Sequence, residues 1–228
     1  MLKKPIIIVN FKTYPDATGQ HAIKLAKICE HVATEMNANI AIAVQALDVF
    51  RVSQAVGIPV LAQHVDGFSA GAHTGSVIPE ALKNAGAAGS LINHSEWRIP
   101  LRNIAAAIDE CHKHGLSVVA CADTPENAKA IARLHPTMLA IEPPDLIGGK
   151  VSVSAARPEI LTQSVNAVNQ NKVKATALLC GAGIHTRADV AKAVELGMEG
   201  VLVASGVVLS RNPEQVLKEL VAGLEKPI

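Results

Sequence analysis

The chain has 228 residues, of which 49% are hydrophobic and 18% are charged, and its formal net charge at pH 7 is +1. This composition is sufficient for a large packed core and is unlike that of a disordered chain. Charges of both signs are scattered along the sequence, so neither a nucleic-acid surface nor a polybasic membrane anchor is predicted.

No apolar run reaches the roughly 18 residues of a membrane-spanning helix, and the apolar stretch near the N-terminus is too short for a signal peptide. We therefore expect a soluble, cytoplasmic protein. The four cysteines are widely spaced, with no C-x-x-C pair and no histidine cluster at zinc spacing, so reduced thiols and no metal site are expected.

Eight short apolar runs alternate with segments of helical periodicity, the pattern of repeated βα units with a parallel sheet. In chain order the predicted strands are residues 6–10, 40–44, 60–63, 90–93, 117–121, 138–142, 177–180 and 200–204. No linker or composition break divides them. We therefore predict a single α/β domain, residues 1–228, folded as a closed (β/α)8 barrel rather than an open sheet.

Capping signals give the start of several helices. Thr124-Pro125-Glu126 and Asn212-Pro213-Glu214 each place a capping side chain before a proline at the first helical position. Thr186-x-x-Asp189 resembles a capping box. Apolar residues at helical spacing stop before Gly115 and before Gly197, which indicates the ends of two helices.

Polar residues stand where several predicted strands end, and in a barrel those ends meet on the face that carries the active site. Glu142 ends the sixth strand, ahead of Pro143 and Pro144. A carboxylate that ends a buried strand is costly unless it has partners or a task. On this stretch alone, a structural carboxylate and a catalytic one are equally good interpretations.

The first and fourth predicted strands are also followed by residues suited to chemistry. Asn10 and Lys12 follow the first strand, although a solvated surface lysine is the simpler interpretation of an N-x-K motif alone. His94 follows the fourth strand, with the carboxylate of Glu96 two residues on. An imidazole that polarises a carbonyl as the neutral form needs a lowered pKa, which a nearby helix N-terminus can provide.

The seventh and eighth strands lead into small residues, Cys180-Gly181-Ala182-Gly183 and Val203-Ala204-Ser205-Gly206. Small side chains leave backbone N–H groups accessible, and the loops after these two strands commonly form a phosphate site in barrels. We therefore predict a phosphate-binding site there, with a short helix that begins near Ser205.

These stretches together resemble the triosephosphate isomerase family over essentially the whole length of the chain. The resemblance rests on residues 10–13, 62–64, 71–75, 93–96 and 142–144, with 147–148. The short chain and the Glu-Pro-Pro and Cys-Gly-Ala-Gly motifs are similar to the compact archaeal-type subgroup. The resemblance implies a TIM barrel that interconverts dihydroxyacetone phosphate and glyceraldehyde 3-phosphate in glycolysis and gluconeogenesis, without a metal or organic cofactor.

The same resemblance implies the roles of individual residues. Glu142 is the base, neutral His94 is the electrophile, and Lys12 and Asn10 stabilise negative charge. The implied catalytic set is Asn10, Lys12, His94, Glu96 and Glu142. The implied substrate-binding residues are Asn10, Lys12, Ile147, Gly148, Ala182, Gly183, Val203, Ala204 and Ser205. A loop over residues 143–150, with the two prolines as a hinge, is expected to cover the reaction.

Three positions depart from the commoner family pattern. Asp145 stands where many members carry tryptophan, Cys180 where they carry tyrosine, and Gly183 where they carry serine. Cys180 cannot supply a phenol hydrogen bond to a closed loop, so the means by which residues 143–150 would be latched stays open.

Residues 64–76 form a connection longer than the usual two to six residues. In the family this loop projects into a second subunit, with Thr74 beside the partner's Asn10 and Lys12. A homo-oligomer is implied, a dimer through this loop and a homotetramer in the compact subgroup.

Two other functions fit parts of the pattern. A metal-dependent sugar-phosphate epimerase would share the phosphate loops, although the sequence offers no pair of metal ligands for it. A barrel that binds a phosphorylated metabolite without turnover is the non-enzymatic alternative, against which the intact Glu142 and His94 argue.

Overall fold

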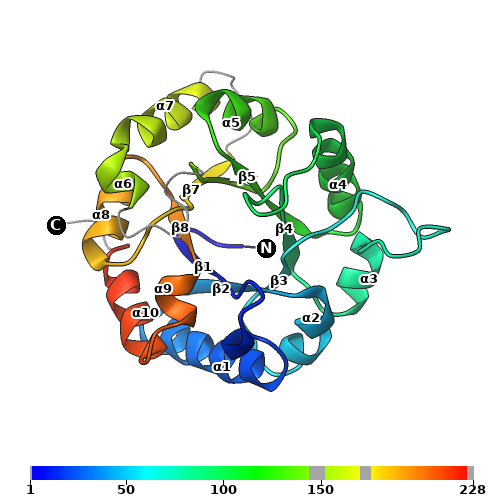
Figure 1. Cartoon of the computed structure of the whole chain (residues 1–228), viewed down its shortest axis with the longest axis horizontal. Coiled ribbons are helices and arrows are strands. Elements are labelled where there is room, and N and C mark those ends of the chain that lie inside the picture. The colour runs from blue at the N-terminus through cyan, green and yellow to red at the C-terminus, as the bar shows by residue number, and fades with distance from the viewer. Residues whose placement is uncertain (1, 144–151, 170–175, 225–228) are drawn as a thin grey trace.

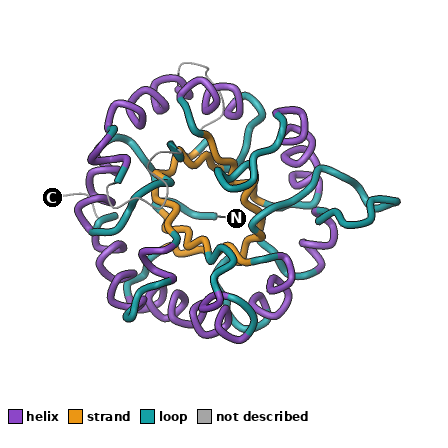
Figure 2. Tube along the Cα trace, in the orientation of Figure 1, coloured by secondary structure: helices purple, strands orange, loops and turns teal. Residues whose placement is uncertain are grey.

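The computed structural model describes residues 2–143, 152–169 and 176–224. Eight parallel strands close into a barrel in the order β1 to β8, and helices form a ring around it (Figure 1). The tube view shows the inner ring of strands and the outer ring of helices (Figure 2). The predicted closed (β/α)8 barrel is therefore confirmed.

The strands are β1 (Ile6–Asn10), β2 (Asn39–Val44), β3 (Val60–Ala62), β4 (Gly89–Ile92), β5 (Ser117–Ala122), β6 (Met138–Ile141), β7 (Ala177–Cys180) and β8 (Gly200–Val203). Each end lies within one residue of the sequence-based prediction. Asn93 and Glu142 fall just outside their strands rather than inside them. Asn93 leaves the strand because its φ is +56°, in the left-handed region.

The helices are α1 (Gln20–Glu35), α2 (Ala46–Ser53), α3 (Pro79–Asn84), α4 (Leu101–Lys113), α5 (Pro125–Ala132), α6 (Val153–Ala156), α7 (Pro158–Asn169), α8 (Arg187–Glu195), α9 (Ser205–Val208) and α10 (Pro213–Ala222), with a 3₁₀ turn at Pro15–Ala17. The predicted caps are confirmed: Thr124 and Asn212 accept hydrogen bonds at the starts of α5 and α10, and Thr186 and Asp189 form a capping box on α8. Among the described residues, no helix has both the length and the apolar character needed to span a bilayer.

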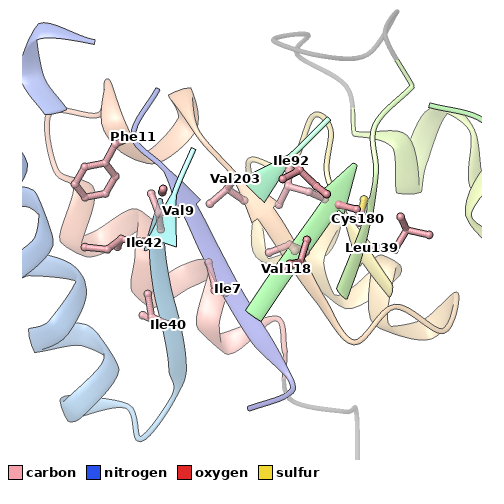
Figure 3. Close-up of a cluster of buried hydrophobic side chains, with 14 of the residues drawn as sticks. Ile7, Val9, Phe11, Ile40, Ile42, Ile92, Val118, Leu139, Cys180 and Val203 are labelled. Carbon is pink, nitrogen blue, oxygen red and sulfur yellow. The ribbon is translucent and has the colours of Figure 1, made fainter. Parts of the chain in front are cut away.

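The strands bury both faces, as a parallel barrel inside a ring of helices requires. Alternate side chains such as Ile7 and Val9 belong to a cluster that includes apolar side chains of the helices. Figure 3 shows strand side chains of this cluster. Ile6 and Ile8 belong to a second cluster, with Leu61, Leu91, Val119 and Leu179 among others, that fills the barrel. This filled interior carries the site at one end of the barrel and is not a channel.

Two glycines let neighbouring strands approach. A Cβ on Gly89 would lie 2.1 Å from the carbonyl oxygen of Ser117 on β5, and one on Gly200 would lie 2.1 Å from the carbonyl oxygen of Ile6 on β1. Gly200 therefore stands where β8 meets β1 and the barrel closes.

Candidate active site

A hollow of about 460 Å³ opens at the carboxyl ends of the strands. Its lining comes from β1, β4, β6, β7 and β8 and the segments after them. Among the predicted site residues it brings together Asn10, Lys12, His94, Glu142, Ala182, Gly183, Val203, Ala204 and Ser205. Ile147 and Gly148 lie outside the described residues, and the predicted loop over residues 143–150 is described only at Pro143.

Glu142 follows β6, and its main-chain N–H still donates to the carbonyl of Ala122 at 2.7 Å, so the strand geometry continues to the carboxylate. The residue is only 1% exposed. Its Oε2 accepts from the main-chain N–H of Ser95 at 3.3 Å, and its Oε1 lies 3.4 Å from His94 Nε2. A buried carboxylate thus lies directly beside an imidazole, and both line the hollow.

Burial raises the pKa of Glu142 to about 7, against the opposing effects of the Ser95 N–H, the Cys121 thiol and the cations Arg98 and Lys12. The proton affinity of this carboxyl is therefore matched to neutral pH, where a group that takes up and returns a proton works best.

His94 is oriented from its other side. The main-chain N–H of Glu96 donates to His94 Nδ1 at 3.2 Å, which leaves the proton of the neutral ring on Nε2, facing Glu142 and the hollow. Burial lowers the pKa of His94 to about 4, Lys12 and Arg98 act in the same direction, and Glu96 opposes them. The imidazole is therefore neutral near pH 7.

A nearby helix N-terminus is the cause that the sequence suggests for a lowered pKa of His94. Burial has the largest effect, and the next helix, α4, begins only at Leu101. The lowered pKa therefore has the expected direction, with burial as its largest cause.

Lys12 adopts φ = +49°, uncommon for a residue with a side chain. Its main-chain N–H donates to Asn10 Oδ1 at 3.0 Å, and its carbonyl accepts from Gln63 Nε2 at 2.9 Å. Lys12 Nζ pairs with Glu96 Oε1 at 2.7 Å. These contacts hold the ammonium at the mouth of the hollow beside His94.

The loops after β7 and β8 line the other side of the hollow with small residues. Gly183 has φ = +69°, and α9 begins at Ser205, as predicted. Gly181 is required by space, because a Cβ there would lie 2.6 Å from Glu142 Cγ. The glycine thus lets the loop pass directly beside the carboxylate.

Some residues of the site carried little signal in the sequence. Gln63 follows β3, so its position pointed to the site, whereas nothing local pointed to Cys121, Arg98 or His185. Arg98 donates to the carbonyl of Asn93 at 3.3 Å and lies 3.5 Å from Asp123. The ring of His185 lines the hollow, with Nδ1 3.0 Å from where a Cβ of Gly206 would stand.

Within the described parts of the chain, one group of side chains has the spacing of metal ligands, namely His31, Glu35 and Glu214 on α1 and α10. Lys218 Nζ lies 2.8 Å from Glu35 and 2.9 Å from Glu214, so an ammonium already pairs with both carboxylates. This surface group does not line the hollow, and the geometry favours an ion-pair cluster between two helices.

The fold and the site together define a (β/α)8-barrel enzyme with a facing carboxylate and imidazole and a wall of small residues at the carboxyl end of the barrel. Residues 5–221 match the sequence model of the family described as Triosephosphate isomerase. The chain is 49% identical over 218 residues to the triosephosphate isomerase of Methanobacterium bryantii, with 96% of each chain covered. It is 48% identical to that of Methanothermobacter thermautotrophicus, with 96% of this chain and 95% of the relative covered.

A third relative, the triosephosphate isomerase of Metallosphaera sedula, is 46% identical over 222 residues, with 97% of this chain and 96% of the relative covered. The chain belongs to the triosephosphate isomerase family, and it is an isomerase. The similarity to archaeal members confirms the compact archaeal-type subgroup indicated by the sequence.

Proposed function

We propose that this chain interconverts dihydroxyacetone phosphate and D-glyceraldehyde 3-phosphate through an enediolate, in glycolysis and gluconeogenesis. The observation that carries the proposal is the buried Glu142 carboxylate facing His94 Nε2 at 3.4 Å within one hollow. This isomerisation moves a proton between adjacent carbons, so it needs one group that takes and returns the proton and another that polarises the carbonyl.

Glu142 is the proposed base. Its pKa of about 7 makes the carboxylate basic enough to remove a carbon-bound proton and acidic enough to give it back. Triosephosphate isomerase is itself a standard example of a carboxylate base paired with a neutral histidine. The Ser95 N–H holds the carboxylate through Oε2, which leaves acceptor capacity for the substrate on Oε1.

His94 is the proposed electrophile, because a neutral ring with its proton on Nε2 can donate to the carbonyl oxygen and receive the proton back from the enediolate. Lys12 and Asn10 supply positive charge and a hydrogen-bond donor for the developing oxyanion. Glu96 is proposed to complete the set by holding Lys12 Nζ and, through its main-chain N–H, the ring of His94.

The substrate phosphate is proposed to bind the loops after β7 and β8, at Ala182, Gly183, Val203, Ala204 and Ser205. The small residues there line the hollow and favour direct contact between an anion and main-chain N–H groups. The roles of Ile147 and Gly148 remain predictions from the sequence.

A coupled assay of triose phosphate turnover tests the proposal. Glu142→Gln keeps the size of the side chain and removes the base, and loss of a general base lowers kcat by about 10²- to 10⁴-fold. Gln63→Asn serves as a comparison, because it alters a supporting amide and leaves the base in place. Near-native turnover by a folded Glu142→Gln protein would show that the base has been assigned wrongly.

We propose that residues 1–228 act as one catalytic domain in the cytoplasm and assemble as a homo-oligomer. The loop between β3 and α3 projects from the ring of helices (Figure 1), and Phe68 and His73 stack within it at a ring distance of 4.3 Å. A dimer formed through residues 64–76, with Thr74 beside the partner's Asn10 and Lys12, explains a structured loop with an exposed aromatic ring. Pairing of dimers into a homotetramer is the further proposal for this subgroup.

A further inference from the structure

Residues 152–154, at the start of α6, are buried against the loop after β7. Ser152, Val153 and Ser154 are buried, and the main-chain N–H of Val153 donates to the carbonyl of Ala182 at 3.2 Å. Ala182 belongs to the proposed phosphate-binding loop. The segment 152–154 therefore touches the anion-binding wall directly.

Asp189 ties both segments to the first turn of α8. Its Oδ2 accepts from the main-chain N–H groups of His185 at 3.1 Å and Thr186 at 2.9 Å, and from Thr186 Oγ1 at 2.8 Å. Its Oδ1 accepts from Ser152 Oγ at 2.6 Å, and its carbonyl accepts from Ser154 Oγ at 3.0 Å. A capping box requires only the contacts with Thr186, so the bonds from the two serines exceed what the helix needs.

These contacts involve a charged carboxylate. Burial alone would raise the pKa of Asp189, but hydrogen bonds from Ser152, Thr186 and the main chain of His185 and Thr186 outweigh it and hold the pKa below its ordinary value. Hydrogen bonds to a charged acceptor are stronger than those between neutral groups.

Cys180 also lies at the contact between segment 152–154 and the loop 181–185. Burial raises the pKa of its thiol to about 12, while the main-chain N–H groups of Ala182 and Ser154 act in the opposite direction. The sulfur therefore lies among donors from the same two segments that Asp189 joins. Cys180 thus stands where many family members carry tyrosine, and segment 152–154 and the loop 181–185 pack together over its small side chain.

The other side of the loop rests on α9. The ring of His185 packs beside Gly206, where a Cβ would lie 3.0 Å from Nδ1, and both residues line the hollow. A shift of the His185 main chain would therefore alter the wall formed by residues 181–185.

We propose that Asp189 is a positioning residue that joins segment 152–154 to the loop 181–185 and thereby holds the backbone of Ala182 and Gly183 in its anion-binding arrangement. The proposal rests on the proposed function for the identity of the anion as a substrate phosphate. Asp189 itself does not line the hollow and acts through the segments that it holds.

The test compares Asp189→Asn, Ser152→Ala and the double variant. Binding of inorganic phosphate is measured by NMR titration, and KM and kcat are measured with both triose phosphates. Hydrogen bonds to charged groups contribute enough for loss of the bridge to weaken phosphate binding by about tenfold, with a similar rise in KM. We expect kcat to change less, because Glu142 and His94 stay in place. The double variant is expected to lose little more phosphate affinity than either single variant, because both substitutions remove the same hydrogen bond between Ser152 and Asp189.

Thr124→Ala is the matched control. It removes the side-chain cap of α5 and leaves the hydrogen bonds of Asp189 in place, so stability falls while the affinity for phosphate stays within about twofold. Ser152→Ala leaves the α8 capping box intact and gives a result even if Asp189→Asn does not fold.

The proposal is overturned if wild-type protein does not bind phosphate, if the folded bridge variants bind it like wild type, or if the two single effects multiply in the double variant. Wild-type protein that binds phosphate without isomerising triose phosphates would instead refute the proposed function, and the binding comparison would still test Asp189.

Discussion

At the scale of the residue, burial shifts the pKa values of the two facing groups in opposite directions. The pKa of the Glu142 carboxyl is raised to about 7, and the pKa of the His94 imidazole is lowered to about 4. In both cases burial away from water is the largest cause. A low-dielectric site disfavours the charged form of each group, so one environment yields a carboxylate more basic than usual and a neutral imidazole. Burial at one end of the barrel thus shifts the pKa values of both groups.

The first residue-scale prediction concerns pH. Because the pKa of Glu142 is raised, the carboxyl keeps its proton until the pH approaches about 7, and kcat/KM rises as the pH increases through that value. His94, at about 4, stays neutral over the same interval. The substrate phosphate also titrates near neutral pH, so the direct measurement is a ¹³C NMR titration of labelled glutamate in the free enzyme. A carboxyl near pKa 7 that disappears in Glu142→Gln is expected, and ordinary titration of every carboxyl near pH 4.5 would contradict the prediction.

A second residue-scale prediction concerns Gly181. A methyl group there would stand 2.6 Å from Glu142 Cγ and 3.1 Å from the carbonyl of Ile141, so Gly181→Ala displaces the carboxylate or the loop. Misplacement of a reacting group by about 1 Å can cost about 10²-fold, and we expect a loss of this order in kcat/KM. Gly57→Ala is the matched control, since its Cβ would meet its nearest atom at 3.4 Å. Equal turnover by the two variants would show that the contact is harmless.

At the scale of the element, the sequence predicted well which segments form strands and which form helices. The eight strands and the three caps on α5, α8 and α10 carry local signals, namely short apolar runs and side chains suited to N-cap positions. Conformations at the ends of strands carry weaker signals. Lys12 and Asn93 have positive φ, and each also contacts a distant residue, Gln63 at the carbonyl of Lys12 and Cys121 at the side chain of Asn93.

The element-scale prediction tests the contact between β4 and β5. Gly89→Ala places a Cβ 2.1 Å from the carbonyl of Ser117, so the two strands must separate. Overpacking of a tight core costs about 1–3 kcal/mol, and a backbone neighbour that cannot rotate away favours the upper end. Urea unfolding measures the loss, with Gly57→Ala again as the comparison. An unchanged midpoint would mean that the strands tolerate the wider spacing.

At the scale of the whole molecule, closure of the barrel determines which residues meet. The repeat of βα units predicted that strand ends would share one face, and this placed Asn10, Lys12, His94 and Glu142 together. It could not predict pairs such as Ser152 and Asp189, which are 37 residues apart and joined by side chains outside any strand. Such contacts depend on the packing of loops, for which the sequence has no periodic signal.

The proposed assembly gives the whole-molecule prediction. Phe68 is 44% exposed in the projecting loop, and a second subunit that covers it would remove this apolar ring from water. Phe68→Glu would place a charge in that interface without removing a core side chain. Sedimentation velocity is therefore expected to show an oligomer for wild type and a shift toward the 23.8 kDa monomer for the variant.

Leu209→Glu is the matched control for this shift, since Leu209 is 52% exposed and follows α9, outside the projecting loop. Its substitution adds the same charge to a similarly exposed apolar position, so it is expected to sediment like wild type. If the loop also supports Lys12 across the interface, the Phe68→Glu monomer loses activity while the pKa values set by burial within one subunit persist. Wild-type protein that sediments as a monomer with full activity would refute both the interface and its contribution to the site.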